Sequence, residues 1–349
     1  MAAEKTYRQR VLEFWEWFPT VAERFGAMLR EQESDEIVPE ISAKMEPLLP
    51  SLSWVLGGTE DAFSFTLTGQ GQVAKQLLTE FWLSQSYELP NWTFYSSRQP
   101  TPIEELKDFG ISLGSEQQVN VENLLIRTAV DEEAELIDIT VWHPAFDNLD
   151  EEHHHPILFI LLDEAFGEFG TQMYLGNVTI EPITEGADTR RLTDLPKFIQ
   201  SVCNYHGWEK LSPMESYSGY QIREPGDFPR GDTLFGTTCV PYIIFDLLEN
   251  KGRLPENPLA GTGAEFAYIA VDGSVFPEGR QVDVRGNIED AIDEALREQA
   301  SGRSLGGAFG ANESYIEMLL LDGENSRQIV KDVLQKLQLA DKSRLEFFV

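Results

Sequence analysis

The C-terminal part of the chain, residues 264–349, switches between strand and helix periodicity in an order that few folds can accommodate. Alternating apolar residues mark strands, and apolar residues three or four positions apart mark helices. The strand-like runs are residues 264–271, 304–311, 314–321 and 345–349, and the helical faces lie in residues 288–296 and 329–337. This order predicts a ferredoxin-like βαββαβ unit over residues 264–349. Because that unit serves many unrelated functions, it implies none of them.

The chain opens with an amphipathic pattern over residues 7–33. Its apolar residues recur at three- and four-residue steps, which predicts a long helix with one buried face. Phe14, Trp15 and Phe18 lie on that face, so we expect them to be buried against the sheet that follows. Trp17 lies outside it and indicates a second contact, and Pro19 predicts a kink or a division of the helix.

Between residues 53 and 181 the order strand–strand–helix–strand occurs twice, although the two copies share almost no sequence. The first copy comprises strands at residues 53–57, 62–68 and 92–97 and a helix at 73–86, and the second comprises strands at 123–130, 136–142 and 172–181 and a helix at 156–169. This repetition predicts a structural ββαβ duplication.

Two domains agree best with the length and with these patterns. A chain of 349 residues is long enough for two ordinary domains, each with its own core. Aromatic, proline and glycine residues become frequent over residues 207–232, which is typical of a boundary. We therefore predict an α+β protein of two α/β-sandwich-like domains. Residues 1–207 form an N-terminal α+β domain with the helical start and the ββαβ repeat, and residues 208–349 form a C-terminal α+β domain that ends in the ferredoxin-like unit.

The chain is strongly acidic. It contains 27 lysine and arginine residues against 59 aspartate and glutamate residues, so its formal net charge is −32. Nucleic-acid binding requires a basic surface, and anionic membranes repel such a charge, so neither is expected as a partner. Three interpretations remain open: colloidal stability alone, a basic protein partner, or mimicry of a polyanion. The longest acidic cluster, residues 147–152, is short and interrupted, which disfavours mimicry.

Cysteine usage and hydropathy indicate the cellular environment. Cys203 and Cys239 cannot form a disulfide framework, and neither belongs to a CxxC motif, so a reducing, intracellular setting is expected. The first 18 residues carry charges every few positions, unlike a signal peptide. The longest apolar run, residues 156–162, is much shorter than the roughly 20 residues of a membrane span. We expect a soluble, cytoplasmic protein.

Several motifs in the first 200 residues resemble those of a bacterial family without a known activity. They are FWEWF at residues 14–18, similar to an FWxWF start, TLTGQG followed by a helix and by ELPNWTFYSSRQP at 88–100, ILFILLDEAFGE at 157–168, and IEPI at 180–183. On these residues the chain resembles proteins grouped near domain of unknown function 695. The resemblance supports the two-part fold and supplies no functional residues.

Three consecutive histidines, His153, His154 and His155, follow a group of carboxylates and are the most obvious candidate metal ligands. Neighbouring residues on a helix point about 100° apart, so three consecutive histidines cannot all face one ion. The i, i+4 pair of an HExxH site is also absent from the sequence. We interpret the histidines as the polar start of a helix near Pro156 and predict no metal site.

Two further motifs favour structural interpretations. Gly302–Gly310 is rich in glycine but lacks the lysine and the helix start of a phosphate-binding loop, so we predict a strand with a bulge or a close backbone approach. The sequence Arg230-Gly231-Asp232-Thr233 is predicted to precede a helix, with Asp232 or Thr233 as its N-cap.

The sequence contains no catalytic spacing. Cys203 and His206 are close in sequence, but a nucleophilic thiolate also needs an activating environment and an oxyanion donor. There is no GxSxG motif. We therefore assign no catalytic residue, no cofactor-binding residue, no metal ligand and no cofactor.

Two functional hypotheses follow. The first is a non-enzymatic interaction module that binds a basic protein partner, as an immunity-like antagonist of a toxin would. The alternative is a hydrolase or small-molecule binder that uses the cleft between the domains, lined by acidic and aromatic groups near Trp142, His143 and Asp147. The residues do not indicate the oligomeric state.

Overall fold

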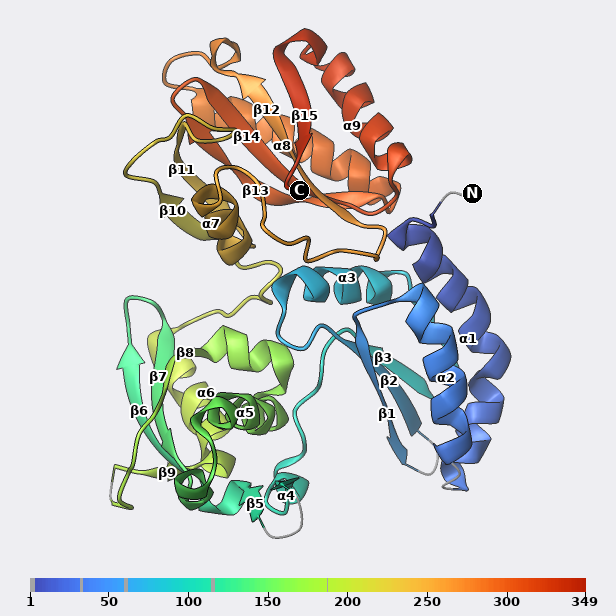
Figure 1. Ribbon diagram of the computed structural model, residues 1–349, viewed down its shortest axis with the longest axis vertical. Coiled ribbons are helices and arrows are strands. Elements are labelled where there is room, and N and C mark those ends of the chain that lie inside the picture. Colours follow the sequence, from blue (N-terminus) through green and yellow to red (C-terminus); the bar gives the residue numbers. More distant parts are fainter. Residues whose placement is uncertain (1–3, 32–33, 60–61, 114–116, 187) are drawn as a thin grey trace.

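The computed structural model describes residues 4–31, 34–59, 62–113, 117–186 and 188–349, and it confirms a mixed α+β architecture. The elements form three groups (Figure 1). We call them the first unit (residues 4–95), the middle unit (residues 103–208) and the last unit (residues 218–349). Among the described residues, no helix has both the length and the apolar composition needed to cross a bilayer.

The first unit packs its helices on a three-stranded sheet (Figure 1). Its elements are α1 Tyr7–Arg30, α2 Ser34–Leu48, β1 Ser53–Thr59, β2 Ala62–Thr68, α3 Val73–Ser84 and β3 Trp92–Tyr95. β1 and β2 are antiparallel, and α3 returns the chain so that β3 lies parallel to β2. α1 begins at a capping box between Thr6 and Gln9 and continues as one helix through Pro19.

The aromatic face of α1 is buried as the sequence predicts. Phe14 and Phe18 are fully buried, and their rings lie 5.5 Å and 5.4 Å from the ring of Phe65 in β2. Trp15 is 3% exposed, and its indole N–H donates to the carbonyl oxygen of Trp82 at 3.0 Å. The burial of this face against the first sheet is therefore confirmed.

The middle unit repeats the connectivity of the first, strand–strand–helix–strand, with additional short elements. Its elements are α4 Ile103–Leu106, β4 Gly110–Leu113, β5 Gln117–Asn120, β6 Leu125–Asp131, β7 Leu136–Trp142, α5 Glu151–Tyr174, β8 Leu175–Ile180, β9 Arg190–Arg191 and α6 Leu195–His206. The main sheet has the order β8-β7-β6-β9, in which β6 and β7 are antiparallel and β7 and β8 are parallel. β4 and β5 form a separate hairpin.

Helix α5 is longer than its sequence pattern indicates. It begins at Glu151 rather than near Pro156, and it ends at Tyr174 rather than giving way to a strand at Gln172. The chain bends inside it at Gly167, whose φ of 72° and ψ of 161° are not helical. The added Cβ of another residue there would lie 2.9 Å from the carbonyl oxygen of Arg98, so the bend depends on glycine.

The last unit contains a six-stranded sheet with two helices on one face (Figure 1). Its elements are β10 Ser218–Gln221, β11 Thr233–Thr238, α7 Pro241–Glu249, β12 Glu265–Asp272, α8 Gln281–Glu298, β13 Gly302–Gly310, β14 Glu313–Leu320, α9 Glu324–Lys336 and β15 Ser343–Phe347. The strand order is β10-β11-β13-β14-β12-β15. Strands β12 to β15 have the order and the antiparallel pairing of the predicted ferredoxin-like unit, and β11 and β10 extend it.

The glycine-rich motif is strand β13, as predicted. Its pairing with β14 shifts between Ser304 and Gly306, which is a β-bulge. Gly306 has a φ of 121°, and a Cβ at this position would lie 2.1 Å from the carbonyl oxygen of Thr237 on β11. The glycine therefore serves a bulge and a close backbone approach.

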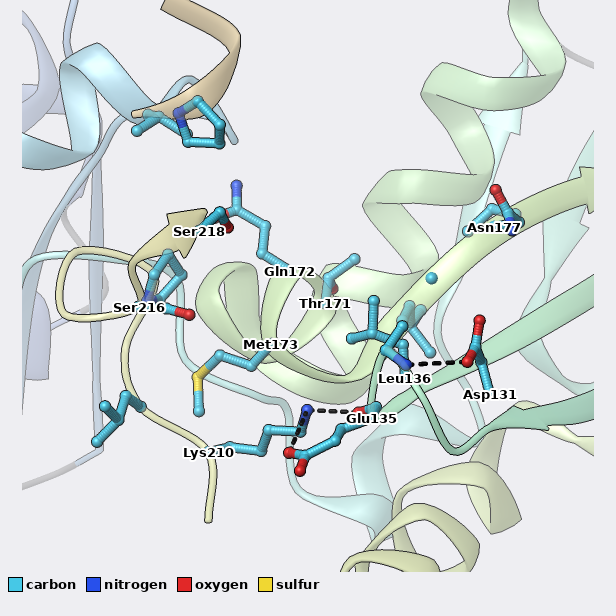
Figure 2. A pocket seen from close by; sticks show the side chains of 18 of the residues that line it. Asp131, Glu135, Leu136, Thr171, Gln172, Met173, Asn177, Lys210, Ser216 and Ser218 are labelled. Atoms are coloured by element: carbon cyan, nitrogen blue, oxygen red, sulfur yellow. Dashed lines mark hydrogen bonds and ion pairs between the residues drawn. The ribbon is translucent and has the colours of Figure 1, made fainter. Parts of the chain in front are cut away.

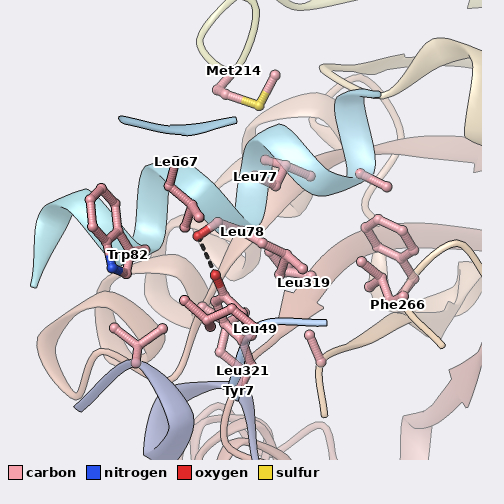
Figure 3. Packing of buried hydrophobic residues seen from close by; sticks show 14 of the residues in the cluster. Tyr7, Leu49, Leu67, Leu77, Leu78, Trp82, Met214, Phe266, Leu319 and Leu321 are labelled. Carbon is pink, nitrogen blue, oxygen red and sulfur yellow. Dashed lines mark hydrogen bonds between the residues drawn. The ribbon is translucent and has the colours of Figure 1, made fainter. Parts of the chain in front are cut away.

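The buried apolar clusters join the first unit to the last unit but leave the middle unit with a core of its own. One cluster combines the first unit with the inner face of the last sheet, one belongs to the middle unit, and one lies between the last sheet and α8 and α9. Figure 3 shows α3 in the first of these, with Leu78 accepting a hydrogen bond from the hydroxyl of Tyr7 at 2.7 Å and Leu319 of the last unit close by. The domain division at residue 207 stays a prediction, because the first and last units share a core.

Candidate functional site

The three units meet around a cavity of about 850 Å³, which we call the three-unit cleft (Figure 2). Its walls are the start of α3, the hairpin between β6 and β7, the end of α5 with β8, the connecting residues 209–218, and the start of α7. These segments are far apart in the sequence, so only the fold brings them together.

An irregularity in the middle sheet shapes one wall of the cleft. Gly176 and Asn177 of β8 together oppose Asp138 of β7, which is a bulge. The backbone N–H of Asn177 donates to Asp138 Oδ1 at 2.6 Å, and its side-chain amide donates to Oδ2 at 3.2 Å. A Cβ at Gly176 would lie 2.3 Å from Asp138 Oδ1, so a larger residue there would displace the Asp138 carboxylate.

Lys210 connects the opposite wall to the β6–β7 hairpin. Its ammonium group donates to the backbone carbonyl of Glu135 and lies 3.9 Å from the carboxylate of the same residue (Figure 2). The side chain is 15% exposed, and its nitrogen lies 5.3 Å from the centre of the Trp208 ring. The only cation that lines the cleft among the described residues is therefore already paired.

The balance of charge in the cleft is negative. Asp131, Glu135, Asp138 and Glu209 line it together with Lys210. A cleft with low-dielectric walls concentrates the field of such a charge excess. The arrangement therefore favours a cationic ligand.

Three apolar side chains from different segments are exposed at the cleft. Phe159 of α5 is 40% exposed, Leu211 of the connecting segment is 61% exposed, and Tyr242 of α7 is 80% exposed. Large apolar groups that gather in this way mark binding surfaces more often than isolated ones do. The cleft therefore presents apolar and acidic groups together.

A buried carboxylate joins the first and middle units beside the cleft. Glu168 of α5 is 1% exposed. It accepts hydrogen bonds from Thr68 Oγ1 at 2.5 Å, Gly71 N at 2.8 Å and Gln76 Nε2 at 2.8 Å, with Arg98 N at 3.4 Å. We call this group the Glu168 latch. It orients the start of α3, which is one wall of the cleft.

The negative charge of Asp163, which also lies on α5, is poorly compensated by its surroundings. Burial raises the pKa of Asp163 to about 6. A hydrogen bond from Thr171 and the charge of Arg98 act in the opposite direction, and the carboxylates of Glu168 and Glu164 raise the pKa further. The Glu168 carboxylate therefore has several hydrogen-bond donors, whereas burial dominates the environment of Asp163.

The two cysteines are buried thiols. Cys239 lines the cleft, where burial raises its pKa to about 11, and burial also raises the pKa of Cys203. Cys203 packs in the middle core, whereas the ring of His206 stacks on Trp208 with 5.0 Å between centroids. The raised thiol pKa values are opposite to what a nucleophile needs.

The three histidines lie in the first turns of α5 and do not converge. The ring of His154 stacks on Phe146 at 4.7 Å, and its Nε2 lies 3.0 Å from the carbonyl oxygen of Leu149. The ligand atoms of Asp150, Glu152 and His153 lie within 4.8 Å of one another, but all three residues are exposed. Exposed acidic groups of this kind are common without an ion, so no metal site is assigned.

The Arg230-Gly231-Asp232-Thr233 motif was expected before a helix, and this prediction is wrong. Thr233 begins strand β11, and Asp232 accepts hydrogen bonds from the backbone of Asn312 at 2.8 Å and from the Tyr315 hydroxyl. An aspartate can satisfy the backbone of a turn as well as that of a helix start, so its presence did not distinguish the two.

Arg230 forms a buried ion pair in the last unit. Its guanidinium donates to Glu317 at 2.6 Å, and both side chains are fully buried. The rings of Tyr268 and Tyr315 lie 5.2 Å and 4.9 Å from the guanidinium carbon. The pair connects Glu317 on strand β14 to the loop that contains Arg230, and it orders the residues that precede β11.

The residues expected to line an interdomain cleft lie elsewhere. The cleft uses the start of β7, at Leu136 and Asp138, whereas Trp142 ends that strand and His143 and Asp147 follow it. His143 is 3% exposed, and its Nδ1 accepts a hydrogen bond from the backbone of Ala145 at 3.0 Å. It stabilises a turn.

The apolar residues of the cleft were not identified from the sequence. Leu211 is isolated and gives no periodic signal, and Phe159 lies within the apolar run at residues 156–162, which does not distinguish buried from exposed positions. For Tyr242 a signal existed, because the short helix PYIIFDLLE is apolar on nearly all sides, and such a helix is either enclosed or leaves an apolar face uncovered.

Comparison with family models, with curated protein sequences and with solved structures gave no match.

Proposed function

We propose that this protein is a non-enzymatic interaction module that binds a basic segment of a protein partner in the three-unit cleft. The observation that carries the proposal is the exposure of Phe159, Leu211 and Tyr242 beside a surplus of carboxylates. Tyrosine is enriched among residues that dominate binding energy, and complementary charge sets orientation and association rate. Antagonism of a basic toxin, an immunity-like role, would use such a cleft.

The alternative is a hydrolase or a small-molecule binder in the same cleft. Such a site needs a nucleophile with a base, or a base that activates water. Among the described residues that line the cleft there is no histidine, and burial holds Cys239 as a thiol. These features favour the interaction module. A cytoplasmic location and membership of the family near domain of unknown function 695 stay predictions.

The proposal can be tested with a fluorescent peptide of alternating lysine and valine, and with a glutamate–valine peptide of equal length. We expect the lysine peptide to bind and the glutamate peptide not to bind. Tyr242→Ala should weaken binding about tenfold. Tyr205→Ala is the matched control, because Tyr205 is 85% exposed and does not line the cleft.

The acidic residues require their own control, because the whole chain is acidic. Asp131→Asn combined with Glu209→Gln removes two charges from the cleft. Glu294→Gln combined with Glu298→Gln removes two exposed charges from α8. Equal weakening by both pairs would show that the peptide binds the general field of the protein, and this result would overturn the proposal.

A further inference from the structure

Strand β8 has one unpaired edge. It is the terminal strand in the order β8-β7-β6-β9 and pairs only with β7. An edge strand presents N–H and C=O groups that can pair with another chain. The sequence of β8, LGNVTI, contains neither the lysine nor the proline that commonly protects such an edge.

The pairing with β7 identifies the groups on the open edge. The backbone N–H of Glu181 donates to the carbonyl oxygen of Val141 on β7 at 3.2 Å, and Asn177 N donates to the Asp138 side chain on the same strand. Backbone groups of alternate residues point to opposite sides of a strand. Val178 and Ile180 therefore direct their N–H and C=O groups away from β7.

The first part of the open edge, up to Val178, lies in the three-unit cleft. Leu175, Gly176, Asn177 and Val178 all line the cavity. Beyond the bulge, Asn177 lies on the exposed face of the sheet and Val178 on its core face, so a cavity that both residues line reaches the strand edge between them. Figure 2 shows β8 running beside the cavity at Asn177, with Ser218 at the start of β10 on the far side.

The apolar face of the middle sheet is incomplete at this edge. Val178 and Ile180 are half-buried and pack against the core of the middle unit. A strand added beside β8 would cover them and extend that core. The neighbouring carboxylates, Asp131, Asp138 and Glu209, would face lysine or arginine residues on the same segment.

We propose that an extended, basic segment of the partner pairs with β8 and becomes an additional strand of the middle sheet. This inference rests on the proposed function and specifies how the partner is held. Main-chain hydrogen bonds supply affinity in such a complex, and alternate side chains supply specificity. A second copy of this chain is disfavoured as the occupant, because each copy carries a net charge of −32.

The backbone pairing can be tested without altering the protein. Two forms of the lysine–valine peptide would be N-methylated, one at every lysine and one at every valine. In an extended peptide each set lies on one edge, so one form cannot pair with β8 and the other can. We expect one form to bind about tenfold more weakly than the unmodified peptide and the other to bind equally. Equal binding of all three peptides would overturn the inference.

The position of the added strand can be tested by amide hydrogen exchange. We expect saturation with the unmodified peptide to slow exchange at Val178 and Ile180 about tenfold or more. The amides of the edge strand β15 are the control and should not change. Val178→Pro removes a donor from the open edge without removing one that faces β7, and it should weaken binding about fivefold or more.

The outcomes separate the two proposals. If the lysine peptide does not bind, the proposed function fails. If it binds and Tyr242→Ala weakens it, but exchange at Val178 is unchanged, the function stands and β8 pairing fails. A dimer in sedimentation analysis that Val178→Pro abolishes would assign the edge to a second copy and would overturn the inference.

Discussion

The first and middle units have the same connectivity and differ in how the last strand of each is covered. In the first unit, the Trp92 indole of β3 donates to the carbonyl oxygen of Ala22 at 3.2 Å, and the Phe94 ring lies 4.7 Å from that of Trp15. In the middle unit, the corresponding strand β8 carries half-buried Val178 and Ile180 beside a cavity. Both strands are terminal in their sheets, but the side chains of β3 are tied to α1, whereas β8 borders a cavity.

The cores of the first and middle units also differ, both in aromatic content and in their connection to the rest of the molecule. The core of the first unit is rich in aromatic rings and is continuous with that of the last unit. The core of the middle unit is largely aliphatic and separate. The middle unit is joined to the rest by its two connecting segments, the Glu168 latch and the walls of the cleft. The following predictions test this difference, from the largest expected effect to the smallest.

Removal of an aromatic ring from the first unit should have the largest effect. Trp15 is 3% exposed and stacks on Trp82 with 5.0 Å between centroids. We expect Trp15→Ala to lower the free energy of unfolding by about 3–5 kcal/mol. Trp17→Ala should cost less, because Trp17 is only half-buried. Equilibrium denaturation measures both, and an unchanged midpoint for Trp15→Ala would show that this residue does not belong to the core.

Loss of the Glu168 latch should have an intermediate effect. Glu168→Ala leaves the donors of Thr68, Gln76 and Gly71 without their acceptor. An unsatisfied buried donor is costly, so we expect a loss of about 2–3 kcal/mol. Glu181→Ala, which removes an exposed carboxylate from the same unit, is the control. If both variants unfold at the same denaturant concentration, the latch does not stabilise the fold.

The secondary-structure elements could be predicted from the sequence where apolar residues recur at a single helical or strand spacing and form one buried face. The stripe with Phe14, Trp15 and Phe18 predicted both a helix and its buried side. The strand and helix runs of residues 264–349 predicted the ferredoxin-like order, because short connections leave few alternatives. The glycines of β13 likewise indicated a bulge in a strand.

The cleft could not be predicted in the same way. Asp138, Lys210 and Tyr242 are ordinary residues in separate segments, and no local pattern relates them. The acidic and aromatic composition near Trp142, His143 and Asp147 indicated a cleft, but these residues lie at the other end of β7, where His143 stabilises a turn. A site assembled from several units becomes visible only when the packing of the units is known.

The buried carboxyl of Asp163 on α5 should make the stability of the protein depend on pH. Burial raises the pKa of Asp163 to about 6, above the ordinary value of 3.8 that applies in the unfolded chain. Between these values the folded protein binds the proton more tightly, so raising the pH through this range lowers its stability. Asp163→Asn removes this penalty and keeps an acceptor for Thr171. We expect the variant to match the wild type below about pH 4 and to exceed it by roughly 2–3 kcal/mol above pH 6. Denaturation midpoints across this range measure the difference, and a constant difference would exclude the proposed environment of Asp163.

The exposed aromatic residue of the cleft should contribute least to stability. Tyr242 is 80% exposed, so Tyr242→Ala should change the free energy of unfolding by less than about 0.5 kcal/mol. Trp15→Ala, by contrast, should destabilise the fold severely, because that ring is enclosed. The same Tyr242→Ala protein should bind the lysine–valine peptide about tenfold more weakly, since the ring lines the cleft. Tyr205→Ala should alter neither quantity. A stability loss at Tyr242 comparable with that at Trp15 would mean that α7 needs this ring for packing, and the apolar side of the cleft would then be structural rather than a binding surface.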